Sequence, residues 1–113
     1  MVMGGTQQPP RDSLSLELRR GALVLAVLVE LRHEQYGYSL KKLLADKGLE
    51  IDEGTLYPLL RRLESQGLLE SAWRVEDGRP RRYYRAGAQG AKLAKDLAAE
   101  WRSLAGVIGK LIG

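Results

Sequence analysis

The hydrophobic periodicity of this chain changes from helical to strand-like and back again, and the order of these segments constrains the fold most. Three segments with helical spacing come first, at residues 14–32, 39–47 and 52–66. Two strand-like segments, 68–76 and 81–86, then flank a turn that begins with Asp77-Gly78. From Gly87 the pattern is helical to the last residue. The predicted fold is mainly α with a small β-hairpin, a winged helix-turn-helix plus a long C-terminal dimerisation helix.

The third helical segment carries the clearest pattern. Four leucines recur at i, i+3, i+4 and i+7 and form one apolar stripe: Leu56, Leu59, Leu60 and Leu63. Asp52 is the expected N-cap. Pro58 conflicts with that start because it stands beyond the first turn, and a start nearer Thr55 would relieve the conflict. With either start, Arg61 and Arg62 point away from the stripe.

The sequence divides into three parts. Residues 1–12 are rich in Gly, Gln and Pro and are predicted to be a mobile N-terminal arm. Residues 13–86 form the predicted winged helix-turn-helix domain, and residues 87–113 form the C-terminal helix. The longest uncharged apolar run, 22–29, is eight residues long and much shorter than the roughly 20 that a membrane helix needs. We therefore expect a buried helix in a cytoplasmic protein that makes no membrane contact.

Composition argues against several classes of function. The chain has no cysteine and one histidine, His33. This excludes disulfides and thiol catalysis and removes most zinc sites and histidine-based catalytic relays. His33 follows the first apolar run, where a polar residue at a helix end is the simpler interpretation. We expect no enzyme, no metal site and no cofactor.

The positive charge is concentrated in one stretch. The net charge is +4, and residues 61–85 alone hold seven arginines against four acidic residues. Guanidinium groups stay charged and donate a planar fork of hydrogen bonds, which suits phosphate. A basic helix followed by a basic hairpin predicts a surface for double-stranded DNA. The alternatives are a charged hairpin that only keeps the protein in solution, or a winged-helix module that docks a protein and binds no DNA.

The last helical segment predicts a second copy of the chain as partner. Its apolar residues are spaced by 3, 4, 3, 4 and 3 residues, as in a coiled-coil seam: Ala94, Leu97, Trp101, Leu104, Ile108 and Leu111. Trp101 has two interpretations. It fills the dimer core, or two Trp101 rings flank a cavity for flat aromatic ligands. A scavenger of aromatic compounds would need Trp101 but not the arginines.

Two stretches carry a family resemblance. Residues 54–71 read GTLYPLLRRLESQGLLES, and residues 78–85 read GRPRRYYR. Together with GYSL at 37–40, they strongly resemble the PadR family of bacterial transcriptional regulators. The resemblance implies that the helix carrying Thr55 and Tyr57 enters the major groove and that the hairpin is a wing on the DNA backbone. It gives these candidate contacts: Thr55, Tyr57, Arg61 and Arg62 on the helix, and Arg79, Arg81 and Arg82 on the wing.

The single C-terminal helix is similar to the short subfamily, in which the first and last helices build the dimer. Some members bind planar drugs between paired tryptophans at a site resembling Trp101. The resemblance thus implies a homodimeric repressor on a pseudo-palindromic operator, released by a planar aromatic effector. Ala86-Gly87 departs from the Leu-Thr usual in the family, so glycine takes the place of a hydroxyl cap.

Overall fold

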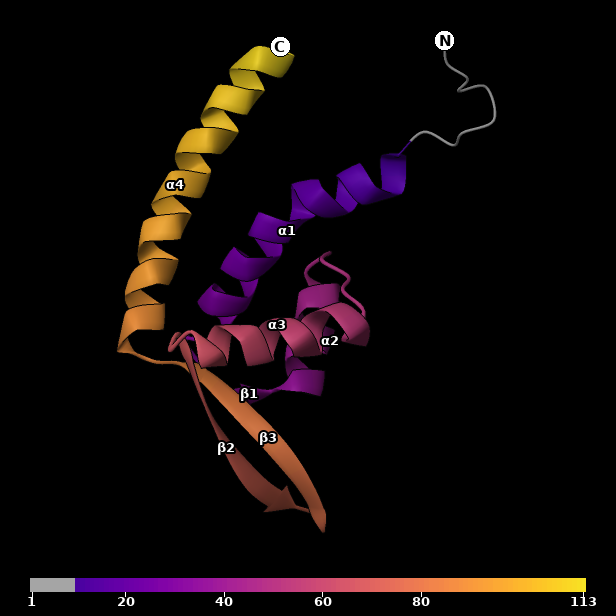
Figure 1. The fold of residues 1–113 in the computed structure, drawn as a ribbon, viewed down its shortest axis with the longest axis vertical. Coiled ribbons are helices and arrows are strands. Elements are labelled where there is room, and N and C mark those ends of the chain that lie inside the picture. The colour runs from indigo at the N-terminus through magenta and orange to yellow at the C-terminus, as the bar shows by residue number, and fades with distance from the viewer. Residues whose placement is uncertain (1–9) are drawn as a thin grey trace.

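The computed structural model describes residues 10–113, which form four helices and a three-stranded antiparallel sheet (Figure 1). The elements are α1 (Arg11–Glu30), β1 (Gln35–Tyr36), α2 (Gly37–Asp46), α3 (Glu53–Ser65), β2 (Leu69–Glu76), β3 (Arg79–Ala86) and α4 (Ala88–Ile112). The predicted fold class is confirmed: the chain is mainly helical, with a hairpin that projects from one end of the helical body.

The first helix begins earlier than the periodicity indicates. The carbonyl of Pro10 accepts hydrogen bonds from the Leu14 N–H and the Ser13 hydroxyl, at 3.0 and 3.1 Å, so the helical backbone already starts at Arg11. Asp12 lies in the first turn, where the helix dipole favours a negative charge. Of the predicted N-terminal arm, residues 1–9 lie outside the described residues, while Arg11 and Asp12 belong to α1.

Helix α3 resolves the conflict over its start in favour of Asp52. Asp52 is the N-cap with extended backbone, the helix begins at Glu53, and Pro58 lies inside it. The proline has no N–H to donate to the carbonyl of Gly54, four residues earlier. Both residues are exposed, so water can satisfy that carbonyl. The start near Thr55 is wrong.

The hairpin closes through a tight two-residue turn. Asp77 and Gly78 both have positive φ, 50° and 74°, as a type I′ turn requires, and Glu76 pairs with Arg79. The second strand therefore begins two residues before the predicted position 81. Strand β1 was not predicted; it pairs with β3 and gives the sheet order β1-β3-β2.

The core lies where the first three helices meet the base of the hairpin. The leucine stripe of α3 is buried as predicted, against Leu28 and Leu31 of the α1 region and Leu40 of α2. The backbone ties α4 to this core: the Ala86 N–H donates to the Leu31 carbonyl at 2.7 Å. Gly87 is the N-cap of α4, as expected.

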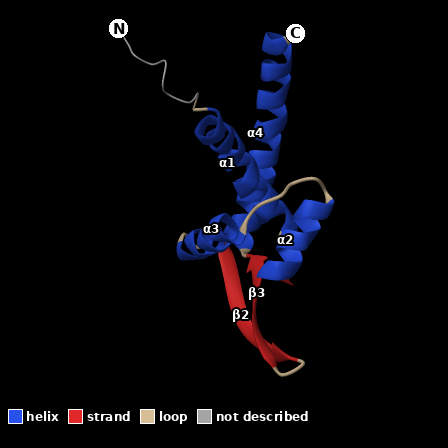
Figure 2. Ribbon diagram, turned by 90° about the vertical axis from the view of Figure 1, so that its right-hand side faces the viewer, coloured by secondary structure: helices blue, strands red, loops and turns tan. Residues whose placement is uncertain are grey.

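Helices α1 and α4 extend beyond this core on the side opposite the hairpin (Figure 2). All side chains from Ala99 to the end of the chain are exposed, and so are those of the first ten residues of α1. The radius of gyration is 17.2 Å, against about 13 Å for a compact domain of this length. Within residues 10–113, no helix is both long and apolar enough to cross a membrane.

Candidate nucleic-acid interface

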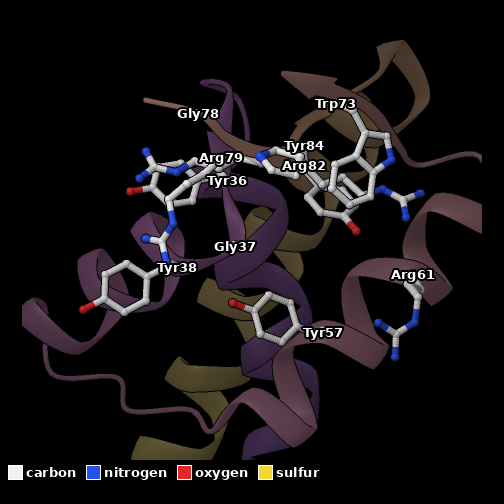
Figure 3. Close-up of a pocket in the computed structure, with 12 residues that line it drawn as sticks. Tyr36, Gly37, Tyr38, Tyr57, Arg61, Trp73, Gly78, Arg79, Arg82 and Tyr84 are labelled. Atoms are coloured by element: carbon white, nitrogen blue, oxygen red, sulfur yellow. The ribbon is translucent and has the colours of Figure 1, made fainter. Parts of the chain in front are cut away.

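A groove of about 760 Å³ separates α3 from the hairpin, residues 69–86, which we call the wing. It is open to solvent and is lined mainly by aromatic rings and guanidinium groups. Figure 3 shows Tyr57 and Arg61 on α3, across the groove from Trp73 and Arg82 of the wing. Tyr36, Tyr38 and Tyr84 also line it.

The four candidate contacts on α3 lie on two different sides of the helix. Tyr57 and Arg61 line the groove beside the wing. Thr55 and Arg62 line a separate groove of about 330 Å³ between α3 and α1. Adjacent helical residues are about 100° apart, which is why Arg61 and Arg62 line two different grooves of the protein surface. The exposed Pro58 lies between the two pairs and has no long side chain to hold a duplex away from the helix.

The seven arginines of residues 61–85 separate into two groups. Three form ion pairs: Arg74 with Glu34 at 2.5 Å, Arg82 with Glu64 at 2.7 Å, and Arg85 with Glu70 at 3.1 Å. The other four form no ion pair with any residue of the described part of the chain: Arg61, Arg62, Arg79 and Arg81. These four are the cations that remain available to an external anion.

The sequence predicts Arg82 as a wing contact, and in the structure its guanidinium is already paired within the chain. Its guanidinium donates to Glu64 Oε1 at 2.7 Å and to Ser71 Oγ at 3.0 Å. The same guanidinium lies 5.4 Å from the ring centroid of Tyr84 and 5.8 Å from that of Trp73. Because the expectation came from sequence order alone, it took no account of Glu64, a residue 18 positions earlier that the fold brings beside Arg82.

Arg81 lies on the opposite strand face from Arg82, by the alternation along β3, and it also lines the groove. Its guanidinium stacks on the ring of Tyr36, 4.6 Å from the centroid, and Tyr36 packs edge-on against Tyr83 at 5.4 Å. The stack orients the guanidinium, while its N–H groups keep their capacity to donate to phosphate. On the same face Arg74 stacks on Tyr83 at 4.8 Å, and Tyr83 donates a hydrogen bond to Glu76.

Two tyrosines of the groove have altered acidity. Burial raises the pKa of Tyr57, and the negative charge of Glu53 adds to the rise. Burial also raises the pKa of Tyr84, while the positive charge of Arg82 opposes the rise. Both phenols therefore stay neutral at physiological pH and keep an O–H group to donate.

Sequence reasoning missed most of the aromatic lining. Trp73 is 66% exposed. In the pairing of β2 with β3, Trp73 lies opposite Arg82 and Ser71 lies opposite Tyr84, so these side chains share one face of the wing. The Asp77-Gly78 turn fixes this register, so the shared face could have been derived from the sequence. A neighbouring groove of about 460 Å³ extends the surface along α2 and adds Lys41 and Lys42.

The predicted seam of α4 is divided between two environments. Ala94 is 2% exposed and lies in the core of its own chain, and Leu97 packs against that core. Ala94 therefore has almost no open surface to offer a partner, whereas Leu97 keeps part of its side chain exposed. The remaining seam residues are exposed: Trp101, Leu104, Ile108 and Leu111. The exposed fraction of Trp101 is 49%. Val107 and Ile112 are exposed as well and extend this apolar surface.

Nothing in residues 10–113 forms a metal centre, since no three His, Asp or Glu side chains there are grouped to hold an ion.

Comparison with known proteins places the chain in a family. The transcriptional regulator PadR-like family matches residues 24–96. A transcriptional regulator of Mycobacterium tuberculosis is 45% identical over 85 residues, covering 74% of this chain and 79% of that protein. The crystal structure of a PadR family transcriptional regulator from Eggerthella lenta has 50% identity and a TM-score of 0.81, covering 89% of this chain and 90% of that one. A transcriptional regulator from Clostridium thermocellum has 32% identity and a TM-score of 0.77, covering 86% and 99%. This protein belongs to the PadR-like family of transcriptional regulators.

Proposed function

We propose that the protein is a homodimeric repressor that binds a pseudo-palindromic operator in double-stranded DNA. Helix α3 enters the major groove, and the wing follows the phosphate backbone. The observation that carries the proposal is a set of four arginines that form no ion pair within residues 10–113, Arg61 and Arg62 on α3 and Arg79 and Arg81 on the wing. Phosphates of the DNA backbone would supply the anions with which these guanidinium groups pair.

The geometry of α3 supports entry into a groove. Tyr57 and Arg61 on one side of the helix and Thr55 and Arg62 on the other flank the short exposed side of Pro58. A helix inserted along that side would bring each pair toward one wall of the major groove, which is about 12 Å wide. Arg61 and Arg62 are the candidates for contact with base edges or with the flanking phosphates.

The exposed ends of α1 and α4 support the homodimer. Both helices carry large apolar side chains that their own chain does not cover, among them Leu14 and Leu18 on α1 and Leu104 and Leu111 on α4. Monomeric proteins rarely leave such continuous apolar surface in water. In the proposed dimer, two copies of α3 lie about 34 Å apart and meet successive major grooves.

Release of the operator is assigned to a planar aromatic effector. Trp101 is half exposed and lies among the apolar residues of α4, so two copies would place two indole rings at one interface. Indole offers a stacking face to a flat ligand. The ligand can shift the dimer between two spacings of the α3 helices only if it binds one spacing more tightly than the other.

DNA titrations test the proposal. A labelled duplex of the DNA immediately upstream of the gene is titrated with wild type, Arg61→Ala, Arg81→Ala and the control Arg85→Ala at several salt concentrations. We expect Arg61→Ala and Arg81→Ala to weaken binding at least tenfold. Arg81→Ala should also reduce the salt slope by about one per subunit. Arg85 is paired with Glu70 and lies outside the groove, so its loss should change affinity little.

Two results contradict the proposal. If Arg61→Ala and Arg81→Ala both bind like wild type, this surface is not the DNA interface. If wild type shows no salt-dependent affinity for the duplex, the wing is better explained as a protein-docking element.

Fluorescence tests the effector. In Trp73→Phe the only tryptophan is Trp101. A planar aromatic cation such as 9-aminoacridine should quench its emission and release the duplex. Quenching without release would indicate a scavenger, and no quenching would remove the ligand from the proposal.

A further inference from the structure

We infer that Glu64, Ser71 and Arg82 form a clamp that sets the position of the wing relative to α3, and that Arg82 supports DNA binding through this clamp rather than by contact with DNA. The inference rests on the proposed function. It assigns a positioning role to an arginine whose place in the basic motif suggests a phosphate contact.

The clamp is a closed ring of three hydrogen bonds between three elements. Glu64 is the second-last residue of α3, Ser71 lies near the start of β2, and Arg82 lies in β3. Arg82 Nη2 donates to Glu64 Oε1 at 2.7 Å, and Arg82 Nε donates to Ser71 Oγ at 3.0 Å. Ser71 Oγ donates to Glu64 Oε2 at 2.5 Å, so both carboxylate oxygens are used.

Aromatic rings restrain the guanidinium further. It lies over the rings of Tyr84 and Trp73. The Arg82 side chain is 35% exposed and the Glu64 side chain 27%, which shields their attraction from solvent better than that of an exposed pair. The clamp uses two of the five N–H donors of Arg82, and the Glu64 carboxylate already balances its charge, so a phosphate gains less from Arg82 than from an arginine without an ion pair.

The clamp holds the wing to the body together with the Arg74–Glu34 ion pair and the stack of Arg81 on Tyr36. All residues from Ala72 to Pro80 are exposed, so burial does not anchor them. Within the described part of the chain, the two bonds to Glu64 are the only side-chain hydrogen bonds that join α3 to the wing. The buried Leu69 and Tyr84 hold the base of the wing in the core, and the clamp adds the side-chain link that helps to set the angle between α3 and the wing, and with it the distance from Arg61 to Arg81 across the groove.

The pair of Arg85 and Glu70 provides a matched control. It joins the same two strands with an Nη2–Oε1 distance of 3.1 Å. Both side chains are about 60% exposed, and within the described residues neither forms a side-chain hydrogen bond or ion pair with α3. Glu70→Gln removes the same charge from the same wing without touching the clamp.

Glu64→Gln separates positioning from contact because the two roles predict opposite signs. If Arg82 bound DNA, losing its carboxylate partner would free a cation and tighten binding. With the clamp, Glu64→Gln weakens binding to the upstream duplex about 10- to 100-fold in the dimer, with an unchanged salt slope. Glu70→Gln leaves affinity equal to wild type or slightly tighter. Arg82→Gln has the effect of Glu64→Gln, and the double variant is no weaker than either.

A measurement without DNA tests the clamp directly. The ¹⁵N order parameters of amides 73–80 report the fast motion of the wing. They should fall in Glu64→Gln and stay at wild-type values in Glu70→Gln. Ser71→Ala removes only the bridging hydroxyl and should lower them less, and it provides a second variant if Glu64→Gln does not fold.

Either of two results overturns the inference: Glu64→Gln binds the duplex as tightly as wild type or more tightly, or its order parameters are unchanged. If wild type itself binds no duplex, the proposed function fails, and the order parameters still decide whether the clamp holds the wing.

Discussion

The ring of Tyr57 on α3 lies so close to the backbone of Gly37 that a β-carbon at position 37 would overlap Tyr57 Cε1. Gly37 is the first residue of α2 and is buried. This contact joins the two helices of the helix-turn-helix at the floor of the groove. The position requires glycine because of the ring, and not because of a left-handed backbone conformation.

Gly37→Ala should therefore push Tyr57 out of place. We expect a loss of about 1–3 kcal/mol in the free energy of unfolding, measured by urea denaturation, because overpacking strains both helices. In a Tyr57→Ala background the same substitution should cost almost nothing, since the obstructing ring is gone. Gly21→Ala, with no atom within 4 Å of the added carbon, is the control and should raise stability by about 0.5–1 kcal/mol. Equal stability of Gly37→Ala and wild type would show that the contact is not rigid.

Gly90→Ala tests how α4 is joined to the body. A β-carbon there would overlap the carbonyl oxygen of Leu68, and backbone cannot rotate away as a side chain can. We expect a loss of about 2 kcal/mol or more in thermal unfolding measurements. Gly106→Ala, on the same helix and with open space around it, should instead stabilise by about 1 kcal/mol. Destabilisation by both substitutions would mean that helix propensity does not govern the end of α4.

Stability should fall at high pH because of the raised pKa values of Tyr57 and Tyr84. Above pH 10, the ordinary pKa of tyrosine, the unfolded chain loses these protons while the folded chain retains them. The contribution is complete below pH 10 and is lost as pH rises through the folded-state pKa. The free energy of unfolding of wild type, relative to that of Tyr57→Phe, should therefore fall as the pH is raised above 10 in urea titrations. A pH-independent difference would contradict the assigned environment.

Leu104→Glu should separate the proposed dimer. Burial of each leucine contributes about 1.5–3 kcal/mol and the dimer holds two copies, so the dissociation constant should rise about 100-fold or more in sedimentation equilibrium. Ser103→Glu adds the same charge one residue earlier, about 100° around α4, and should leave the constant within a few-fold of wild type. A monomeric wild type at micromolar concentration would refute the assembly.

The fold could be predicted where local chemistry decides it. The leucine stripe of α3 and the Asp77-Gly78 turn each depend on residues close in sequence, and both were placed correctly. Strand β1 has two residues, too few to show any period, and it exists because β3 offers Tyr83 and Tyr84 as partners.

The candidate site was predictable in position but not in detail. The arginines mark the surface proposed for DNA, yet only the tertiary structure shows that Arg82 is bound to Glu64 while Arg79 is left without an ion pair in the described residues. Likewise, a spacing of three and four residues indicates an apolar helix face but does not indicate whether the same chain or a partner covers that face. Ala94 was therefore predicted to contact a partner, although the core of its own chain buries it.

The tight contact between Gly90 and Leu68 makes α4 a lever arm. From that fulcrum to Ile112 the helix is about 33 Å long, so a tilt of 5° moves its far end by about 3 Å. The converse also holds. In the proposed dimer, a displacement of a few ångströms at the far end of one α4 would turn the winged-helix part of that chain by several degrees. A ligand bound at Trp101 that displaces α4 would therefore change the spacing of the two α3 helices, so that they no longer fit successive major grooves of the operator.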